Sequence, residues 1–129
     1  MITMKRFVMN DYLWKVITVP VNSRYLLSRT GPTVGTTDPS TLCVYISEEL
    51  TGEFKKRVIA HEMGHALCFS YNLIPQIRAC CYPSRQVEME EFICNFVANY
   101  GEMIFSITYK ILGDSALAQV PYHLERMIA

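Results

Sequence analysis

His61, Glu62 and His65 are the residues in this sequence whose types and spacing could do chemistry. They stand in the segment HEMGH, so the two histidines are four residues apart. On an α-helix such residues lie about 40° apart around the axis and about 6 Å apart along it, so both imidazoles can reach one ion. Glu62 lies at the side of the same face, where it can take a proton from a water molecule on that ion. The spacing predicts one Zn²⁺ site, with Glu62 as general base.

The residues around this motif are apolar. Between Val58 and Phe69 the motif supplies the only polar side chains, and the apolar ones cover nearly the whole circumference, which is typical of a buried helix. A bound metal ion would remove the cost of burying three polar groups without partners. Gly64 is unfavourable inside a helix by about 1 kcal/mol relative to alanine, so we expect another segment to pass close to it. The alternatives are a metal-free hydrogen-bonded core cluster and a chance match on a surface helix.

The third ligand is expected among the acidic residues of a second helix. A catalytic zinc site needs three protein ligands and an open fourth position. The segment EMEEFICNFVANY offers Glu88, Glu90 and Glu91, although acidic residues also favour a helix N-terminus whatever their other roles. Glu90 falls at the margin of the bulky apolar side of that helix, whereas Glu91 points the other way. His123, the remaining histidine, is interpreted as a surface residue near a chain end.

The residues next to Glu91 favour it as the third ligand. The small side chain of Cys94 beside it suits a face that packs against another helix, here the one that contains Gly64. Asn95, one turn after Glu91, could hydrogen bond to a group that holds the metal. Glu88 is the alternative ligand.

The elements that would position these residues begin with strands. Residues 13–21 are rich in β-branched side chains and predict a strand near a sheet edge. Residues 29–41 are dense in glycine, proline and threonine and predict a loop or a hairpin tip. Residues 41–47 predict a second strand with two alternating faces. One face would carry Leu42, Val44 and Ile46, and the other Cys43 and Tyr45.

Helices are predicted after the strands. The first runs from Thr51, a capping residue type, to about Tyr71, and Pro75 prevents its continuation. The second runs over residues 88–112, with Gly113 as its C-terminal cap. Residues 119–129 predict a short terminal helix. This order predicts an α+β fold in which a small twisted sheet of about three strands packs on an active-site helix and a second long helix.

The composition indicates one globular domain over residues 1–129. Hydrophobic residues make up 50% of the chain, too many for a disordered protein, and 12 basic residues balance 12 acidic ones, which argues against direct binding to nucleic acid or to a membrane surface. Asp11 and Lys15 interrupt the apolar stretch that a signal peptide would need. The five cysteines form no C-x-x-C spacing. We therefore expect a cytoplasmic protein with reduced thiols, Cys80 and Cys81 among them.

Two segments resemble the paired motifs of the ImmA/IrrE-type zinc metallopeptidases. HEMGH is similar to the family's H-E-x-G-H, and EFICNFVA, residues 91–98, is similar to E-x-x-A-N-x-F-A. Cys94 and Val97 stand where alanine and phenylalanine are usual. The resemblance extends over about residues 42–104.

This resemblance implies a zincin-like fold with one Zn²⁺, in which Glu91 corresponds to the family's ligand glutamate. The family is frequent in phages, mobile elements and stress-response operons. Some of its members cleave a helix-turn-helix repressor, so the resemblance also implies a protein substrate of that regulatory kind.

The expected function is that of a zinc-dependent peptidase, in which Glu62 takes the proton of the attacking water. A second group that polarises the substrate carbonyl could come from Tyr45, Tyr71, Tyr122 or His123. If the strand over residues 42–46 lies at the sheet edge, it could pair with an extended substrate. Two alternatives are a non-catalytic regulatory protein that keeps zinc for stability and binds a partner, and a hydrolase of non-peptide substrates.

Overall fold

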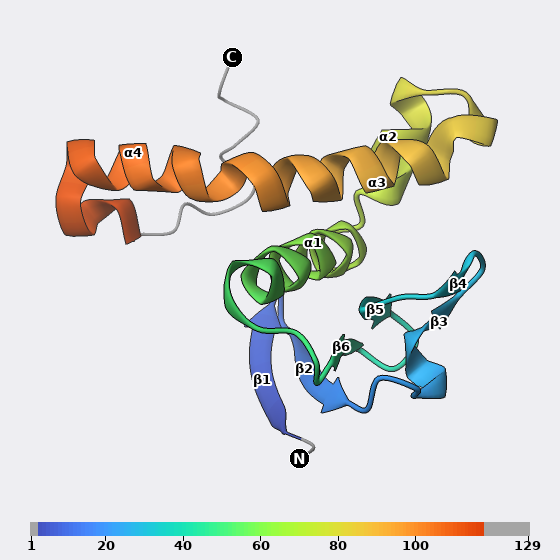
Figure 1. Cartoon of the computed structure of the whole chain (residues 1–129). Coiled ribbons are helices and arrows are strands. Elements are labelled where there is room, and N and C mark those ends of the chain that lie inside the picture. The colour runs from blue at the N-terminus through green and yellow to red at the C-terminus, as the bar shows by residue number, and fades with distance from the viewer. Residues whose placement is uncertain (1–2, 118–129) are drawn as a thin grey trace. The chain divides into compact units, whose positions relative to one another are not determined.

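The computed structural model describes residues 3–117, and Figure 1 shows how their helices and strands follow one another. The chain divides into two compact units, one ending at Asn99 and the other beginning at Tyr100. The first unit contains both sheets, three helices and the predicted metal ligands. The helix predicted for residues 119–129, and with it Tyr122 and His123, lies outside the described residues.

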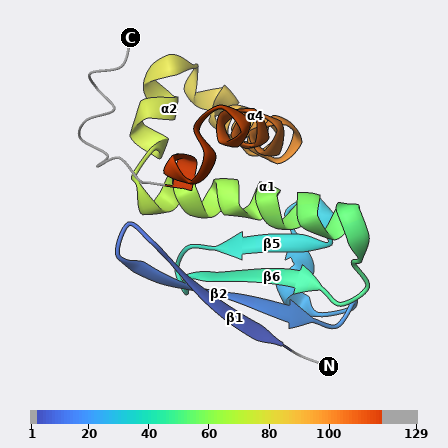
Figure 2. The ribbon, with the colours of Figure 1, turned by 90° about the vertical axis from the view of Figure 1, so that its left-hand side faces the viewer.

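A four-stranded mixed sheet forms one layer of the first unit (Figure 2). Its strand order is β1 (Met4–Met9), β2 (Tyr12–Val19), β6 (Cys43–Ser47) and β5 (Gly35–Asp38). β2 and β6 are parallel, while β1 and β5 run antiparallel to their neighbours. The two strands predicted from the sequence are β2 and β6. β1 and β5 were not predicted, so the sheet has four strands where about three were expected.

The segment predicted as a loop or hairpin tip, residues 29–41, contains strands. β3 (Leu27–Ser28) and β4 (Gly31–Pro32) form a separate antiparallel hairpin after the 3-10 turn η1 (Arg24–Leu26). β5 follows and pairs with β6. The loop prediction was therefore wrong for β5. The glycine and threonines of this strand pack against α1 (Gly52–Ser70), and composition alone does not reveal that contact.

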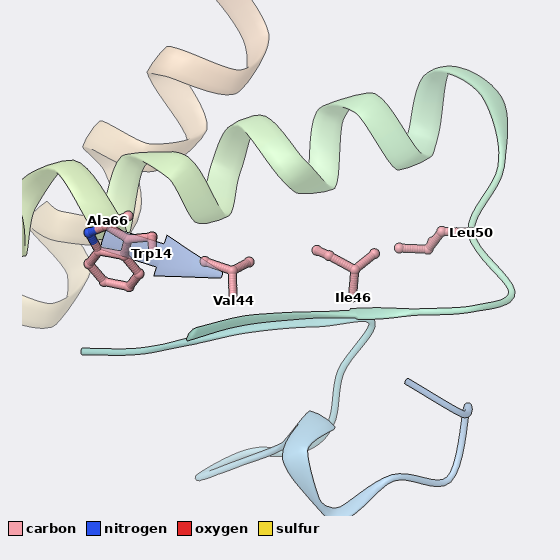
Figure 3. Close-up of a cluster of buried hydrophobic side chains, with 5 residues drawn as sticks. All are labelled: Trp14, Val44, Ile46, Leu50 and Ala66. Atoms are coloured by element: carbon pink, nitrogen blue, oxygen red, sulfur yellow. The ribbon is translucent and has the colours of Figure 1, made fainter. Parts of the chain in front are cut away.

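β6 separates two buried clusters. Val44 and Ile46 lie toward α1, in a cluster that also includes the buried Trp14 and Ala66 (Figure 3). Cys43 and Tyr45 lie on the opposite face, packed with Val19 and Leu26. The predicted alternation of this strand is confirmed. Because β6 is buried on both faces, it supports α1 and the motif on that helix.

α1 spans nearly the residues predicted for the first helix. Thr51 is its N-cap residue and Tyr71 its C-cap residue. Asn72 then adopts a left-handed backbone conformation, with φ 54°, which asparagine tolerates better than most residues. α2 (Ile74–Cys80) begins two residues later, with Pro75 in its first turn. Pro75 therefore opens a second helix that was not predicted.

The second predicted helix consists of three helical segments. α3 (Gln86–Phe96) follows the 3-10 turn η2 (Pro83–Arg85) and ends in a π-helical turn, η3 (Val97–Gly101). α4 (Glu102–Leu112) belongs to the second unit and ends at Gly113, whose φ of 65° agrees with the predicted cap. The 3-10 turn η4 (Gly113–Leu117) is the last described element of that unit. Over residues 3–117, no helix combines the length and apolar character needed to cross a membrane.

Candidate metal centre

α1 packs closely against α3 at Gly64. A Cβ atom added to Gly64 would lie 2.9 Å from Sγ and 3.0 Å from Cα of Cys94, so any larger side chain would collide with α3. Cys94 itself is fully buried. The close approach predicted from Gly64 and from the small neighbour of Glu91 is therefore confirmed. It holds Glu91 beside the helix that carries both histidines.

His61, His65 and Glu91 meet across this contact. Their ligand atoms all lie within 4.8 Å of one another. The Glu91 carboxylate faces both rings, with Oε2 3.3 Å from Nε2 of His61 and Oε1 3.0 Å from Nε2 of His65. Four tetrahedral bonds of about 2.1 Å to a zinc ion would place neighbouring ligand atoms about 3.4 Å apart. The two distances from Glu91 are close to this value, and the three side chains could together hold a metal ion.

The second nitrogen of each imidazole is held by α3. Oδ1 of Asn95 lies 2.9 Å from Nδ1 of His61, and Oε1 of Glu90 lies 3.1 Å from Nδ1 of His65. A hydrogen donated from each Nδ1 to these oxygens leaves the Nε2 lone pairs pointing toward Glu91, which is the tautomer that a metal ligand needs. Asn95 thus contacts one of the candidate ligands, as its position on the helix predicted; the metal-supporting role stays a prediction.

Glu90 was not predicted in this role. It lies next to Glu91 on α3, and the two carboxylates reach opposite nitrogens of His65. Burial lowers the pKa of His65, but the hydrogen bond to Glu90 and the nearby charges of Glu62 and Glu91 outweigh it and raise the pKa overall. The imidazole therefore sits where a positive charge is favoured, whether a proton or a metal ion supplies it.

Glu62 is buried against β5, with 6% of the residue exposed. The hydroxyl of Thr37 donates a hydrogen bond of 2.6 Å to its Oε2. A Cβ atom at Gly35 would lie 2.8 Å from Val58 and 3.3 Å from Cγ of Glu62, so only glycine leaves space for both side chains there. These contacts of β5 hold the carboxylate in place, and the sequence pattern alone did not indicate them.

A cleft of about 1280 Å³ opens onto the site. It is lined by the β3–β4 hairpin, β5, α1 and α3, among others. The lining includes His61, Glu62, His65, Glu90, Glu91 and Asn95. The side chain of Glu91 is 48% exposed. The candidate metal centre is therefore reachable from solvent.

A polar ladder, defined here as three residue pairs, connects α1 to α3 and its π-helical end. Nη1 of Arg57 donates a hydrogen bond of 2.5 Å to Oδ1 of Asn99. The next pairs along the helices are His61 with Asn95 and His65 with Glu91. Each step advances four residues on α1 and goes back four on α3, as in antiparallel helices. The candidate metal ligands are thus part of a longer polar contact.

The other candidate residues lie elsewhere. Tyr45 is on the sheet face opposite α1, where its ring stacks on that of Tyr25 with 4.4 Å between centroids. Tyr71 ends α1 and, like Tyr45, does not line the cleft. Glu88, the alternative ligand, forms an exposed ion pair of 3.1 Å with Arg85. In the described residues, neither tyrosine is placed to polarise a substrate at the metal centre.

The strand at the sheet edge beside the cleft is β5. β6 was considered for that position, but it lies between β2 and β5 in the sheet. An extended ligand could therefore add to the sheet at β5 and not at β6.

The sequence matches no family model and no curated protein. The likeness of the two helical motifs to the ImmA/IrrE-type metallopeptidases therefore stays a prediction.

Proposed function

We propose that this protein is a zinc-dependent peptidase with a zincin-like fold, related to the ImmA/IrrE-type enzymes. The observation that supports this most directly is the convergence of His61, His65 and Glu91 within 4.8 Å. Glu62 lies on the same helix and close enough to raise the pKa of His65. Two imidazoles, one ligand carboxylate and a second, buried carboxylate form the combination that zinc peptidases use.

The donor set favours zinc over the common alkaline-earth ions. Mg²⁺ and Ca²⁺ prefer oxygen ligands, whereas imidazole nitrogen suits Zn²⁺ and other late first-row metals. With three protein ligands, a fourth position stays open toward the cleft. When bound there, Zn²⁺ would lower the pKa of a water molecule and polarise the substrate carbonyl.

Glu62 has the proton-transfer role in this proposal. Its carboxylate accepts a proton as water attacks the peptide carbonyl, and then donates it to the leaving amine. The hydrogen bond from Thr37 to Oε2 leaves Oε1 for this transfer. Glu90 and Asn95 keep the two imidazoles in the orientation that the ligands need.

The proposed substrate is a peptide or protein segment in extended conformation. β5 ends the four-stranded sheet and lines the cleft, so its outer edge offers main-chain groups to such a segment. By the resemblance of its motifs, a helix-turn-helix repressor in the cytoplasm is the protein substrate that we propose.

Metal analysis and one conservative substitution test the proposal. We expect about one equivalent of zinc in the purified protein and far less in His61→Ala. Glu62→Gln should retain zinc but cleave a quenched-fluorescence peptide library slower by a factor on the order of 10² to 10⁴. Less than about half an equivalent of zinc in the wild type would contradict the site. Retained zinc together with a function that Glu62→Gln leaves unchanged would indicate a structural metal in a regulatory protein.

A further inference from the structure

Arg57 belongs to the one pair of the polar ladder, Arg57 with Asn99, that includes neither a candidate metal ligand nor a residue that orients one. It precedes His61 by one turn of α1, about 6 Å along the helix axis. Its Nη1 is held by Oδ1 of Asn99 at 2.5 Å, and the residue lines the same cleft as the metal ligands. Asn99 carries no charge, so this hydrogen bond orients the guanidinium without neutralising it.

The acidic residues that line the cleft contact partners other than Arg57. Glu62 accepts the hydrogen bond from Thr37, while Glu90 and Glu91 face the imidazoles. Arg29, between the two strands of the β3–β4 hairpin, adds a second cationic side chain to the lining. Away from the metal centre, the charged side chains of the cleft lining are therefore arginines.

We propose that Arg57 binds a carboxylate of the substrate close to the bond that is cleaved. A guanidinium has five N–H donors, and those that Asn99 does not use can bind a carboxylate in bidentate fashion. An extended peptide advances about 3.3 Å per residue, so a distance of about 6 Å corresponds to about two residues. The preferred substrates thus carry an acidic side chain, or a free C-terminal carboxylate, about two residues from the scissile bond.

This inference rests on the proposed peptidase function, but its test does not require turnover. Zinc-loaded Glu62→Gln protein is titrated with pools of fluorescent decapeptides that have Asp, Asn or Lys at one fixed position and mixed residues elsewhere. All pools have amidated C-termini. For an exposed ion pair, we expect the Asp pool to bind about fivefold more tightly than the Asn pool. This advantage should shrink as salt screens the pair.

Substitutions at residue 57 assign the preference to the arginine. Arg57→Gln should abolish the advantage of the Asp pool, and Arg57→Glu should transfer it to the Lys pool. Lys55→Gln is the matched control, since Lys55 is exposed on the same helix and does not line the cleft. Equal binding of the Asp and Lys pools, or an unchanged preference in Arg57→Glu, would overturn the proposal for amidated peptides.

A second arm identifies the source of the carboxylate. Neutral peptides with a free C-terminus are compared with the same peptides amidated, in Glu62→Gln alone and combined with Arg57→Gln. If the free terminus gains affinity only when Arg57 is present, the arginine binds a chain end. If neither acidic side chains nor free termini depend on Arg57, the carboxylate site does not exist. Zinc content and peptide cleavage by the wild type test the peptidase function separately from either result.

Discussion

Oδ1 of Asn95 lies 2.9 Å from Nδ1 of His61, and this contact determines which nitrogen of the ring is turned toward Glu91. The asparagine belongs to α3 and the histidine to α1. The orientation of a candidate metal ligand on one helix is therefore set by the other helix. The packing of the two helices and the affinity for a metal ion are linked through this pair.

Replacing Asn95 should weaken metal binding without removing a ligand. Asn95→Leu deprives Nδ1 of its acceptor, and loss of such a partner typically costs about 10-fold to 100-fold in metal affinity. Asn95→Asp keeps an acceptor and should bind zinc at least as tightly as the wild type. Competition with a chromogenic chelator measures both affinities. Equal affinities in the wild type and in Asn95→Leu would show that the contact does not orient His61.

Gly64→Ala should destabilise the protein although alanine is the better helix former. The added Cβ would lie 3.0 Å from the backbone Cα of Cys94, which cannot rotate away. Overpacking of this kind costs about 1–3 kcal/mol, against a gain of about 1 kcal/mol in helix propensity. Urea denaturation should show a net loss in free energy of unfolding.

Cys94→Ala in the Gly64→Ala background provides the control for this prediction. It removes the Sγ atom at 2.9 Å but leaves the Cα atom in place, so only part of the loss should be recovered. A rise in the free energy of unfolding for Gly64→Ala alone would contradict the close contact of α1 and α3.

Thr37→Val should slow catalysis while leaving zinc content unchanged. Valine has nearly the shape of threonine but cannot donate the hydrogen bond of 2.6 Å to Glu62, and removing a partner from a buried charged group costs about 1–3 kcal/mol. If half of that loss appears in proton transfer, kcat falls by a factor between about 2 and about 13. Thr37→Ser keeps the hydroxyl and should retain most of the activity. A variant with serine as slow as the one with valine would indicate that shape, and not the hydrogen bond, matters.

The metal-free protein should be less stable above neutral pH than at mildly acidic pH. The hydrogen bond to Glu90 and the nearby carboxylates raise the folded-state pKa of His65 above its ordinary value of 6.5, despite burial. Folding thus stabilises the protonated form of His65. The resulting contribution to the free energy of unfolding is full below about pH 6.5 and is lost as pH rises through the folded-state pKa. Melting temperatures of chelator-treated protein from pH 5.5 to 8.5 should show the decline.

Glu90→Gln separates this effect from other titrations. It removes the charge beside Nδ1 of His65 while leaving an oxygen that can accept the hydrogen bond. The decline in melting temperature with pH should become shallower in this variant. An identical decline in both proteins would assign the effect to another group.

The parts of the site that depend on one helix were predictable from sequence. The four-residue spacing of His61 and His65 gives their shared direction on any α-helix, and Gly64 pointed to a close neighbour. The choice of Glu91 over Glu88 followed from its small neighbour Cys94, and the contact of Cys94 with Gly64 supports that reasoning.

The parts that depend on contacts between distant segments were not predictable. β5 has the composition of a loop, and it forms a strand where Gly35 and Thr37 fit beside α1. Glu90 lay at the margin of the face predicted to be apolar, yet its carboxylate reaches back to His65. Pro75 was interpreted as the end of one helix, although proline at a first turn equally starts another.

β5 is held along its inner edge and on both faces, while its outer edge adjoins the cleft. The inner edge pairs with β6. Thr37 hydrogen bonds to Glu62 on one face, and Thr36 donates a hydrogen bond to the carbonyl of Tyr25 on the other. A polypeptide that added itself to that outer edge would stiffen the strand on which Glu62 rests. Binding of the substrate would then also fix the position of the Glu62 carboxylate. A peptide long enough to span the strand would therefore be cleaved faster than a short one with the same scissile bond.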